Sequence, residues 1–392
     1  MRGIHGLQPV VVVVKKTLEN RFADTQFELK PFYPSSAHLL GPVSSFPRLV
    51  NMMKSEPSPD LIVFDTRFFS LLIETGYLDP FPDAYGLEMD YDTVSEFRSF
   101  APDLALYALP FGRIPEGLFY NKAIFDEFRI PYPSDGMTWD EITEIAESMN
   151  SERYSGIEAG YYELMASQLS LRFYEPESER VNVESEEWKE LIQLLLRLND
   201  VADKSFFGQF SIGETAMYVG PVSHLFSYQS NLRVFGVDWE IAGYPVFDDG
   251  RRLQPAGRVY GIGVPARSKN KEDAYKVMRY LLSRESQLEN SRRGIVSLRS
   301  EAEDFMDQFG ASTMLAGKHV SSLLSDMPRG VRDPVFEFFY HMESELSEIV
   351  MADHDAKYSV MQTVQRRLQQ HIPILVAERQ LFVEEMQSLL ND

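Results

Sequence analysis

Residues 107–128 read YALPFGRIPEGLFYNKAIFDEF, and this stretch decides the fold class. A short apolar run ends at a proline, a patch rich in glycine and proline follows, and an extended apolar run resumes at Leu118–Tyr120. Asn121 is placed to cap a short helix at Lys122–Phe128. This order of strand, turn, strand and capped helix is typical of a chain that crosses between two α/β lobes with a cleft between them.

Strand and helix patterns alternate on both sides of this crossing. Leu61–Phe64 is an apolar run of the buried parallel-strand type, Thr66 is placed to cap the helix after it, and Gly76 is placed to end that helix in a left-handed conformation. The five valines of Val10–Val14 favour a buried strand. Other expected elements are a strand at Gln26–Pro31, a capping box at Thr138 and Glu141, helices capped by Ser185 and Asn270, strands at Trp239–Val246 and Val259–Pro265, and a helical region from Asp333 that Pro373 breaks. The alternation predicts an α/β fold.

Length and charge bound the function. With 392 residues and 44% hydrophobic composition, the chain is long enough for two packed lobes, because single cores stop growing at roughly 250–300 residues. A net charge of −21 disfavours binding to nucleic acid and to anionic lipid through a basic patch. We therefore expect neither a nucleic-acid partner nor a charge-driven membrane contact.

The absence of cysteine excludes disulfides, a thiol nucleophile, thiolate zinc and iron–sulfur clusters. No apolar run approaches the roughly 18–20 residues that span a membrane. Met1–Gln8 lacks the features of a signal peptide.

Enzyme signatures are missing from the sequence. It contains no G-x-S-x-G elbow, no H-E-x-x-H pair and no G-x-x-x-x-G-K-[ST] loop. Asp90-Tyr91-Asp92 and Asp248-Asp249-Gly250 resemble fragments of calcium loops without the full spacing. We predict a protein that is not an enzyme and that holds no cofactor and no metal.

Several segments resemble the family 1 bacterial extracellular solute-binding proteins, the maltose-binding-protein-like proteins of ABC importers. They include the strand and helix at Pro59–Gly76, the crossing at residues 107–128, the segment Gly156–Gln168, the segment Gly213–Pro221 with its Ala-Met pair, and the return segment Pro255–Pro265. The resemblance implies the two-lobe periplasmic-binding-protein fold of type II, with an interlobe cleft and hinge crossovers. It implies an N-terminal lobe of residues 1–109 plus 257–315 and a C-terminal lobe of residues 110–256 plus 316–392. It also places the first helix, rather than a strand, at Val10–Phe22.

The function that the resemblance implies is the substrate-binding subunit of an ABC importer, which captures an oligosaccharide or modified sugar by lobe closure. The implied partners are a small carbohydrate and the transporter's permease subunits, and the expected state is a monomer. The implied location is extracellular, on an N-terminal lipid anchor, although the signal peptide and lipidated cysteine of the family are absent from this sequence. The alternatives are a sensor partner that presents the ligand, and an enzyme on the same scaffold.

Ligands of open α/β sheets sit beyond the carboxyl ends of the strands, and aromatic, Arg and Asp side chains suit a sugar's apolar faces and hydroxyl rim. The alternative role of Asp65 and Thr66 is helix capping. The alternative role of Phe111 and Arg113 is packing at the hinge. Of Tyr161 and Tyr162, one is expected to lie in the core. Pro221-Val222-Ser223 stands where the family usually has a tryptophan. The arginines are equally suited to a sugar acid or another anion. The candidate ligand residues are Asp65, Thr66, Arg67, Phe111, Arg113, Tyr161, Tyr162, Gly220, Pro221, Ser223, Arg258 and Tyr260.

Overall fold

The chain forms two compact units of mixed helix and sheet in the computed structural model. The structure describes residues 2–6, 18, 22, 28–31, 53–54, 58–81, 91–159, 162–172, 174–175, 178, 180–182, 185–201, 208–297, 302–324, 329–330 and 357–391. Unit 1 comprises Met1–Arg113, Arg258–Thr313 and Leu375–Asp392, and unit 2 comprises Ile114–Gly257 and Met314–Ile374.

The sheet of unit 1 has the strand order β2-β1-β3-β11-β4. β1 pairs in parallel with β2 and β3, whereas β11 runs antiparallel to β3. All five residues of β3 are buried, which explains why this strand is a continuous apolar run ending in an aspartate. The strands are β1 (Arg2–Gly6), β2 (Glu28–Pro31), β3 (Leu61–Asp65), β4 (Leu109–Ile114) and β11 (Arg258–Gly263).

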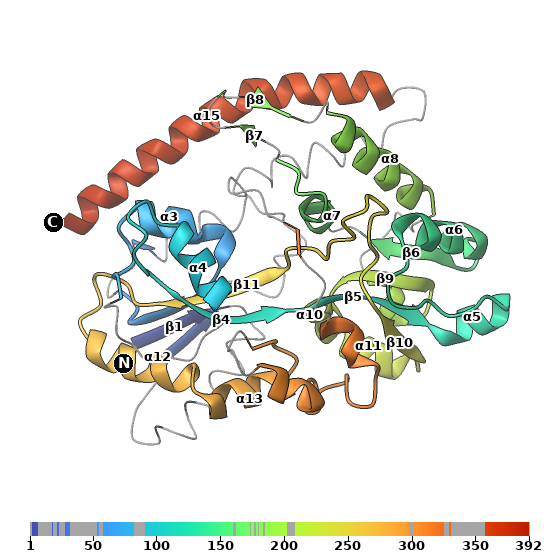
Figure 1. Ribbon diagram of the computed structural model, residues 1–392, viewed down its shortest axis with the longest axis horizontal. Coiled ribbons are helices and arrows are strands. Elements are labelled where there is room, and N and C mark those ends of the chain that lie inside the picture. Colours follow the sequence, from blue (N-terminus) through green and yellow to red (C-terminus); the bar gives the residue numbers. More distant parts are fainter. Residues whose placement is uncertain are drawn as a thin grey trace. The chain divides into compact units, whose positions relative to one another are not determined.

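Helices cover both faces of this sheet: α3 and α4 lie on one face and α12 and α13 on the other (Figure 1). The rings of Phe64 and Phe97 each lie 5.3 Å from the ring of Phe69 and form part of the core. A Cβ at Gly261 would meet these phenylalanine rings at 2.9 and 3.0 Å, so the close approach of β11 to this core requires glycine. The helical segments of unit 1 are η3 (Thr66–Phe68), α3 (Phe69–Glu74), α4 (Tyr91–Ser99), α12 (Lys271–Leu281), α13 (Arg284–Arg292) and η4 (Ala302–Gln308).

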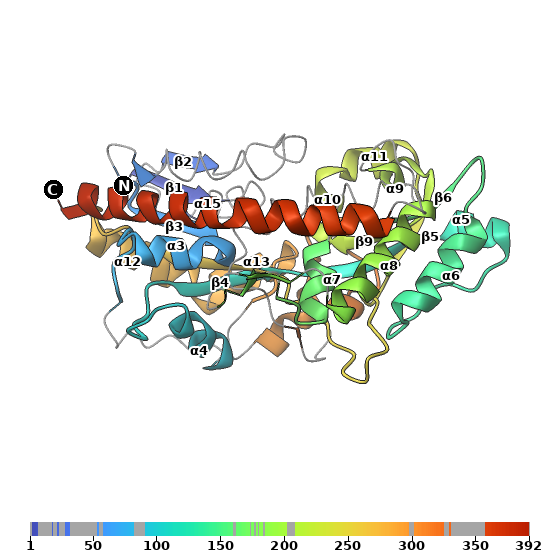
Figure 2. The ribbon, with the colours of Figure 1, turned by 90° about the horizontal axis from the view of Figure 1, so that it is seen from above.

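The long C-terminal helix α15 (Lys357–Asn391) differs from expectation in two ways. Pro373 lies inside the helix and does not break it. Residues 375–392 belong to unit 1, whereas the sequence assigned all of 316–392 to the C-terminal lobe. The reason is packing: Val383 and Met386 are buried in the core of unit 1 beside α3, over which the end of α15 runs (Figure 2). The bidentate ion pair of Arg379 with Glu74 adds a second attachment.

The sheet of unit 2 has the order β10-β5-β9-β6. β5 runs antiparallel to both β9 and β10, and β6 runs parallel to β9. Its strands are β5 (Glu116–Asn121), β6 (Ser155–Ala159), β9 (Thr215–Pro221) and β10 (Trp239–Ala242), and β7 (Tyr174–Glu175) pairs separately with β8 (Arg180–Val181). Its helical segments are α5 (Lys122–Phe128), α6 (Trp139–Met149), α7 (Tyr162–Gln168), α8 (Glu186–Val201), α9 (Gln209–Ile212), α10 (Val222–Ser227), α11 (Gln229–Val234) and η5 (Val320–Leu324).

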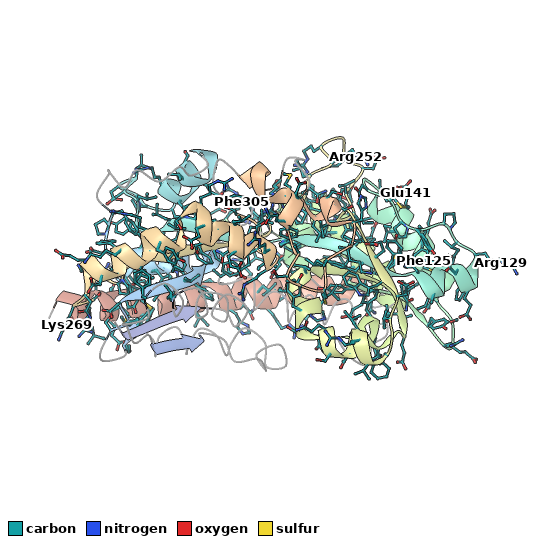
Figure 3. All side chains as sticks on the ribbon, turned by 90° about the horizontal axis from the view of Figure 1, so that it is seen from below. Phe125, Arg129, Glu141, Arg252, Lys269 and Phe305 are labelled. Carbon is teal, nitrogen blue, oxygen red and sulfur yellow. The ribbon has the colours of Figure 1, made fainter. Side chains whose placement is uncertain are left out.

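Several of the expected helix caps are confirmed. Asn121 accepts the N–H of Ala123 at the start of α5, and Thr138 and Glu141 form both bonds of the capping box at α6. Figure 3 labels Glu141 there, and it labels Arg129 at the left-handed C-terminal cap of α5. Ser185 caps α8 through the N–H of Trp188, and Gly76 has a positive φ of 70° as predicted.

The cap expected at Thr66 is wrong, and Asn270 is the N-cap residue of α12 as predicted but makes no capping bond with its side chain. The Oγ1 of Thr66 donates to the carbonyl of Val259, and the side chain of Asn270 donates to the buried carboxylate of Asp60. The strands expected at Trp239–Val246 and Val259–Pro265 end earlier, at Ala242 and Gly263. The segments Val10–Val14, Val10–Phe22 (apart from Leu18 and Phe22) and Asp333–Ala356 lie outside the described residues. No helix in the described parts of the chain has the length and apolar character that crossing a membrane requires.

Candidate functional site

In unit 1, the predicted ligand residues gather where β3 ends. Asp65, the last residue of β3, is the register partner of Tyr260 in β11. Because the two strands are antiparallel, the beginning of β11 meets the carboxyl end of β3 there. Thr66 is fastened to the same edge, since its Oγ1 lies 3.2 Å from the carbonyl oxygen of Val259. We call Asp65, Thr66 and Tyr260 the unit 1 edge; all three are buried.

The backbones of Arg67 and Arg258 continue from the unit 1 edge. Arg67 lies in the turn η3, directly after Thr66, and Arg258 is the first residue of β11. Their side chains lie outside the described part of the structure. Their roles as ligand contacts therefore remain predictions.

Phe111 and Arg113 lie on β4 and differ in what holds them. Phe111 is completely buried and its carbonyl accepts a hydrogen bond from the side chain of Gln287, which favours the packing role. The backbone of Arg113 pairs with Val296 in both directions, at 2.9 and 2.8 Å. Arg113 is therefore fixed in place and its side chain is 9% exposed.

In unit 2, the strands β6 and β9 bring a second set of predicted residues together. The two strands are parallel, and Ala159 is the register partner of Val219, so their carboxyl ends meet at one edge of the sheet. Gly220 and Pro221 end β9 and are buried, while Ser223 follows in α10 and is partly exposed. We call these three residues the unit 2 edge. Tyr162 begins α7 just after β6, but its side chain, and all of Tyr161, lie outside the described residues.

Glu116 and Arg329 are charged residues at this edge that sequence reasoning did not select. Glu116 begins β5, is buried, and is the register partner of Pro221. Burial lowers the pKa of Arg329, and the neighbouring carboxylate of Glu116 acts in the opposite direction. The Nη1 of Arg329 also donates to the carbonyl of Pro255 at 3.0 Å. No motif surrounds Arg329 in the sequence, so only the tertiary fold identifies it.

The segment that carries Arg329 is held tightly against α7. The N–H of Gly330 donates to the carbonyl of Gln254 at 2.8 Å. A Cβ at Gly330 would lie 1.8 Å from the carbonyl oxygen of Ser167, so only glycine allows the two backbones to approach so closely. The end of α7 is fixed in turn by Gln168, whose amide donates to the carbonyls of Pro245 and Leu253.

Two acidic fragments of the sequence resemble parts of calcium loops. Within the described residues, no three His, Cys, Asp or Glu side chains are grouped so that they could hold a metal ion. The Asp248-Asp249-Gly250 fragment is part of a turn in which Asp249 accepts the N–H groups of Arg251 and Arg252. Burial raises the pKa of Asp249, but hydrogen bonds and the charge of Arg251 outweigh this and lower it. Asp90 of the other fragment lies outside the described residues.

Two α/β units, each with predicted ligand residues at the strand ends of its sheet, define a binding protein of the two-lobe class. The family model for the bacterial extracellular solute-binding proteins matches residues 46–288, and the chain belongs to that family. Its members are extracellular. The predicted family and α/β class are thereby confirmed.

Solved structures of solute-binding proteins share the fold along nearly the whole chain. The ABC substrate-binding protein Lmo0181 from Listeria monocytogenes, in complex with cycloalternan, has a TM-score of 0.74 at 15% identity, covering 95% of this chain and 98% of that one. UgpB from Mycobacterium tuberculosis, in complex with glycerophosphocholine, has a TM-score of 0.72 at 16% identity, covering 94% and 95%. The maltotriose-binding protein of Thermus thermophilus, bound with maltotriose, has a TM-score of 0.68 at 16% identity, covering 95% and 100%. No curated protein matches the sequence significantly.

Proposed function

We propose that this chain is the substrate-binding subunit of an ABC importer and that its ligand is a carbohydrate, either an oligosaccharide or a modified sugar. The observation that carries the proposal is the position of the predicted ligand residues at the strand ends of each unit, where β11 brings Tyr260 to Asp65 from a distant part of the sequence. Asp65, Thr66 and Tyr260 share one edge, and Gly220, Pro221 and Ser223 share the other. In an open α/β sheet this edge is where ligands bind.

The chemistry of the edges suits a hydroxylated ligand. A sugar presents a rim of hydroxyl groups that pair with carboxylate, hydroxyl and guanidinium groups, and apolar faces that pack on aromatic rings. Asp65 supplies a carboxylate, Ser223 a hydroxyl, and Arg67, Arg113 and Arg258 supply guanidinium groups. We assign to Tyr161 and Tyr162 the aromatic rings that would pack on the apolar face of the sugar, because Pro221-Val222-Ser223 contains no aromatic residue.

The ligands named with the similar structures support a carbohydrate ligand as the first candidate and a ligand with an anionic group as the second. Two of the three structures reported above hold the oligosaccharides cycloalternan and maltotriose. The third holds glycerophosphocholine, which carries a phosphodiester. Arg329, a partly buried cation beside the unit 2 edge, favours a ligand with an anionic group as the second candidate.

A thermal-shift screen tests the proposal. The probes are maltotriose, a cyclic oligosaccharide, a sugar alcohol, a sugar acid and glycerophosphocholine, with a peptide and a polyamine as negative controls. A ligand present at ~100 times its dissociation constant adds about 2.7 kcal/mol to the free energy of unfolding. Stabilisation by a neutral oligosaccharide supports the first candidate, and stabilisation by the acid or the phosphodiester alone supports the second. Stabilisation by the peptide or polyamine alone contradicts both.

Two measurements distinguish a transport protein from an enzyme and from a sensor partner: the fate of the ligand and the identity of the proteins that bind this chain. A carrier returns its ligand unchanged, so chromatography of a long incubation should recover all of the ligand, whereas an enzyme on this scaffold would convert it. Crosslinking on cells should capture permease subunits if the chain serves an importer, and a membrane sensor if it presents ligand. Membrane anchoring through an N-terminal lipid and a monomeric state complete the proposal, and native mass spectrometry of the mature protein measures both.

A further inference from the structure

A buried glutamate and a buried histidine face each other behind the unit 2 edge. Glu158 is the next-to-last residue of β6, and His224 lies in the first turns of α10. The Nε2 of His224 lies 3.3 Å from Oε1 of Glu158, and the two side chains are only 6% and 9% exposed. At this distance a protonated imidazole and a carboxylate form an ion pair, which burial shields from solvent.

The carboxylate of Glu158 is held from a second direction. Its Oε1 accepts the N–H of Gly208 at 2.9 Å and its Oε2 accepts the N–H of Phe210 at 3.2 Å. These two donors belong to the cap and first turn of α9. Both oxygens therefore have a backbone donor, which is the arrangement that a buried anion requires.

The imidazole is fixed by aromatic rings. It stacks on the ring of Tyr218 in β9, with centroids 4.9 Å apart and planes 22° apart, and it contacts the ring of Tyr228 at 4.8 Å. The hydroxyl of Tyr218 donates to the carbonyl of Pro221, the residue at which α10 begins. The titratable groups in these contacts with His224 are Glu158 from β6, Tyr218 from β9 and Tyr228, the C-cap of α10.

These contacts tie the start of α10 to the end of β6. Ser223, a predicted ligand residue, is the neighbour of His224 in the chain, and Pro221 caps the same helix. α10 has six residues and no side-chain hydrogen bond at its N-terminal cap, so tertiary contacts hold its first turn. The Glu158–His224 contact therefore joins the end of β6 to α10, the helix that follows Gly220 and Pro221 and carries Ser223.

We propose that Glu158 and His224 are a positioning pair: their contact holds the first turn of α10 in place and so orders the unit 2 edge. The strength of this contact depends on pH. The pair is strongest where the imidazole is protonated and the carboxylate ionised. Where the imidazole is neutral, the charge attraction is absent and the first turn of α10 is held less tightly. The ordering of Pro221–Ser223, and with it the affinity for ligand, then falls. We call the contact between Glu158, His224 and the first turn of α10 the clamp. The effect of the clamp on ligand affinity rests on the function proposed above, whereas the clamp itself does not.

Hydrogen exchange of the ligand-free, full-length protein tests the clamp directly. Exchange is followed in peptides covering α10 at about pH 6 and about pH 8, after correction for the intrinsic rate. The variants are Glu158→Gln and His224→Gln, and His371→Gln is the matched control because His371 is exposed on α15. We expect the wild type and the control to lose protection in α10 by at least about threefold between the two pH values. Both clamp variants should show low protection that does not depend on pH.

The melting temperature of each variant, measured in parallel, separates local loosening from global unfolding. Equal protection of α10 at both pH values in a wild type that stays folded overturns the proposal, as does retained pH dependence in a folded His224→Gln variant.

Affinity forms the second arm, with maltotriose and glycerophosphocholine as probes at the same two pH values. A weaker wild-type affinity at about pH 8 that becomes pH-independent in His224→Gln supports the link to ligand, and an affinity equal at both values overturns that link. If neither probe binds at either pH, the ligand classes proposed above are wrong. The hydrogen-exchange experiment then still shows whether the clamp holds α10.

Discussion

Tyr260 in β11 lies directly opposite Asp65 in β3, although the two residues are 195 positions apart in the sequence. Asp65 ends the strand that precedes the first crossing between units, and Tyr260 belongs to the strand that follows the return crossing. The register of this one strand pair therefore sets which residues make up the unit 1 edge.

Replacement of Asp65 by Asn should weaken ligand binding about tenfold, because a charge-assisted hydrogen bond to a ligand hydroxyl becomes a neutral one. The melting temperature of the ligand-free protein should change little, since Asn keeps the shape of the side chain. Titration calorimetry with the probe found in the screen measures the affinity.

Asp79→Asn is the matched control for this variant. Asp79 is an acid of the same unit that pairs with Lys271 and Tyr275. Its replacement should reduce stability and leave affinity unchanged. Normal affinity in the Asp65 variant would show that Asp65 has a structural role.

Replacement of Arg329 by Gln should destabilise unit 2, because it leaves the buried carboxylate of Glu116 without its neighbouring cation. We expect a loss of about 1–3 kcal/mol, the cost of removing one partner of a buried polar group. The double variant Glu116→Gln, Arg329→Gln should recover much of this loss, as chemical denaturation will show. A double variant no more stable than Arg329→Gln would mean that the two side chains are not coupled.

Gly330→Ala should lower the stability of the protein by at least about 2 kcal/mol, because the added methyl group meets the backbone of Ser167, which cannot move away cheaply. Gly243→Ala is the matched control: its Cβ would meet Asp135 at 3.4 Å, an ordinary contact. Denaturant unfolding of both variants should separate them clearly. Equal midpoints would contradict the close approach of Gly330 to α7.

Ligand should reduce the radius of gyration in solution scattering. The function proposed above includes closure of the two units on the ligand, which favours the closed state by its contacts with both. Scattering curves that superimpose with and without a saturating ligand would mean that the lobe-closure part of the proposal is wrong.

Dialysis against a chelator should leave affinity for the ligand unchanged. The acidic fragment at Asp248-Asp249 forms a turn closed by the N–H groups of Arg251 and Arg252, so its carboxylates have another role. The test is calorimetry before and after dialysis. A large loss of affinity that calcium restores would reveal a metal site.

The sequence determined the local features of this protein. The cap at Asn121 and the capping box of Thr138 and Glu141 depend on neighbours within a few positions, and the structure has them as predicted. The crossing at residues 107–128 also has two strands and a capped helix, but β4 and β5 run through Gly112 and Gly117, where the sequence predicted a turn. The buried run of β3 was visible for the same reason, since a strand covered on both faces is apolar throughout. The family resemblance rested on such short segments.

Only the tertiary structure decided where long-range partners lie. Thr66 and Asn270 look like helix caps, but their side chains bind Val259 and Asp60, which are distant in the sequence. Pro373 stays inside α15 because the helix is held on both sides of it, by hydrogen bonds of Gln365 and Gln369 to Val181 before it and by the core of unit 1 after it. The pairing of Glu158 with His224 or of Glu116 with Pro221 depends on the register of the sheet, which no short segment encodes.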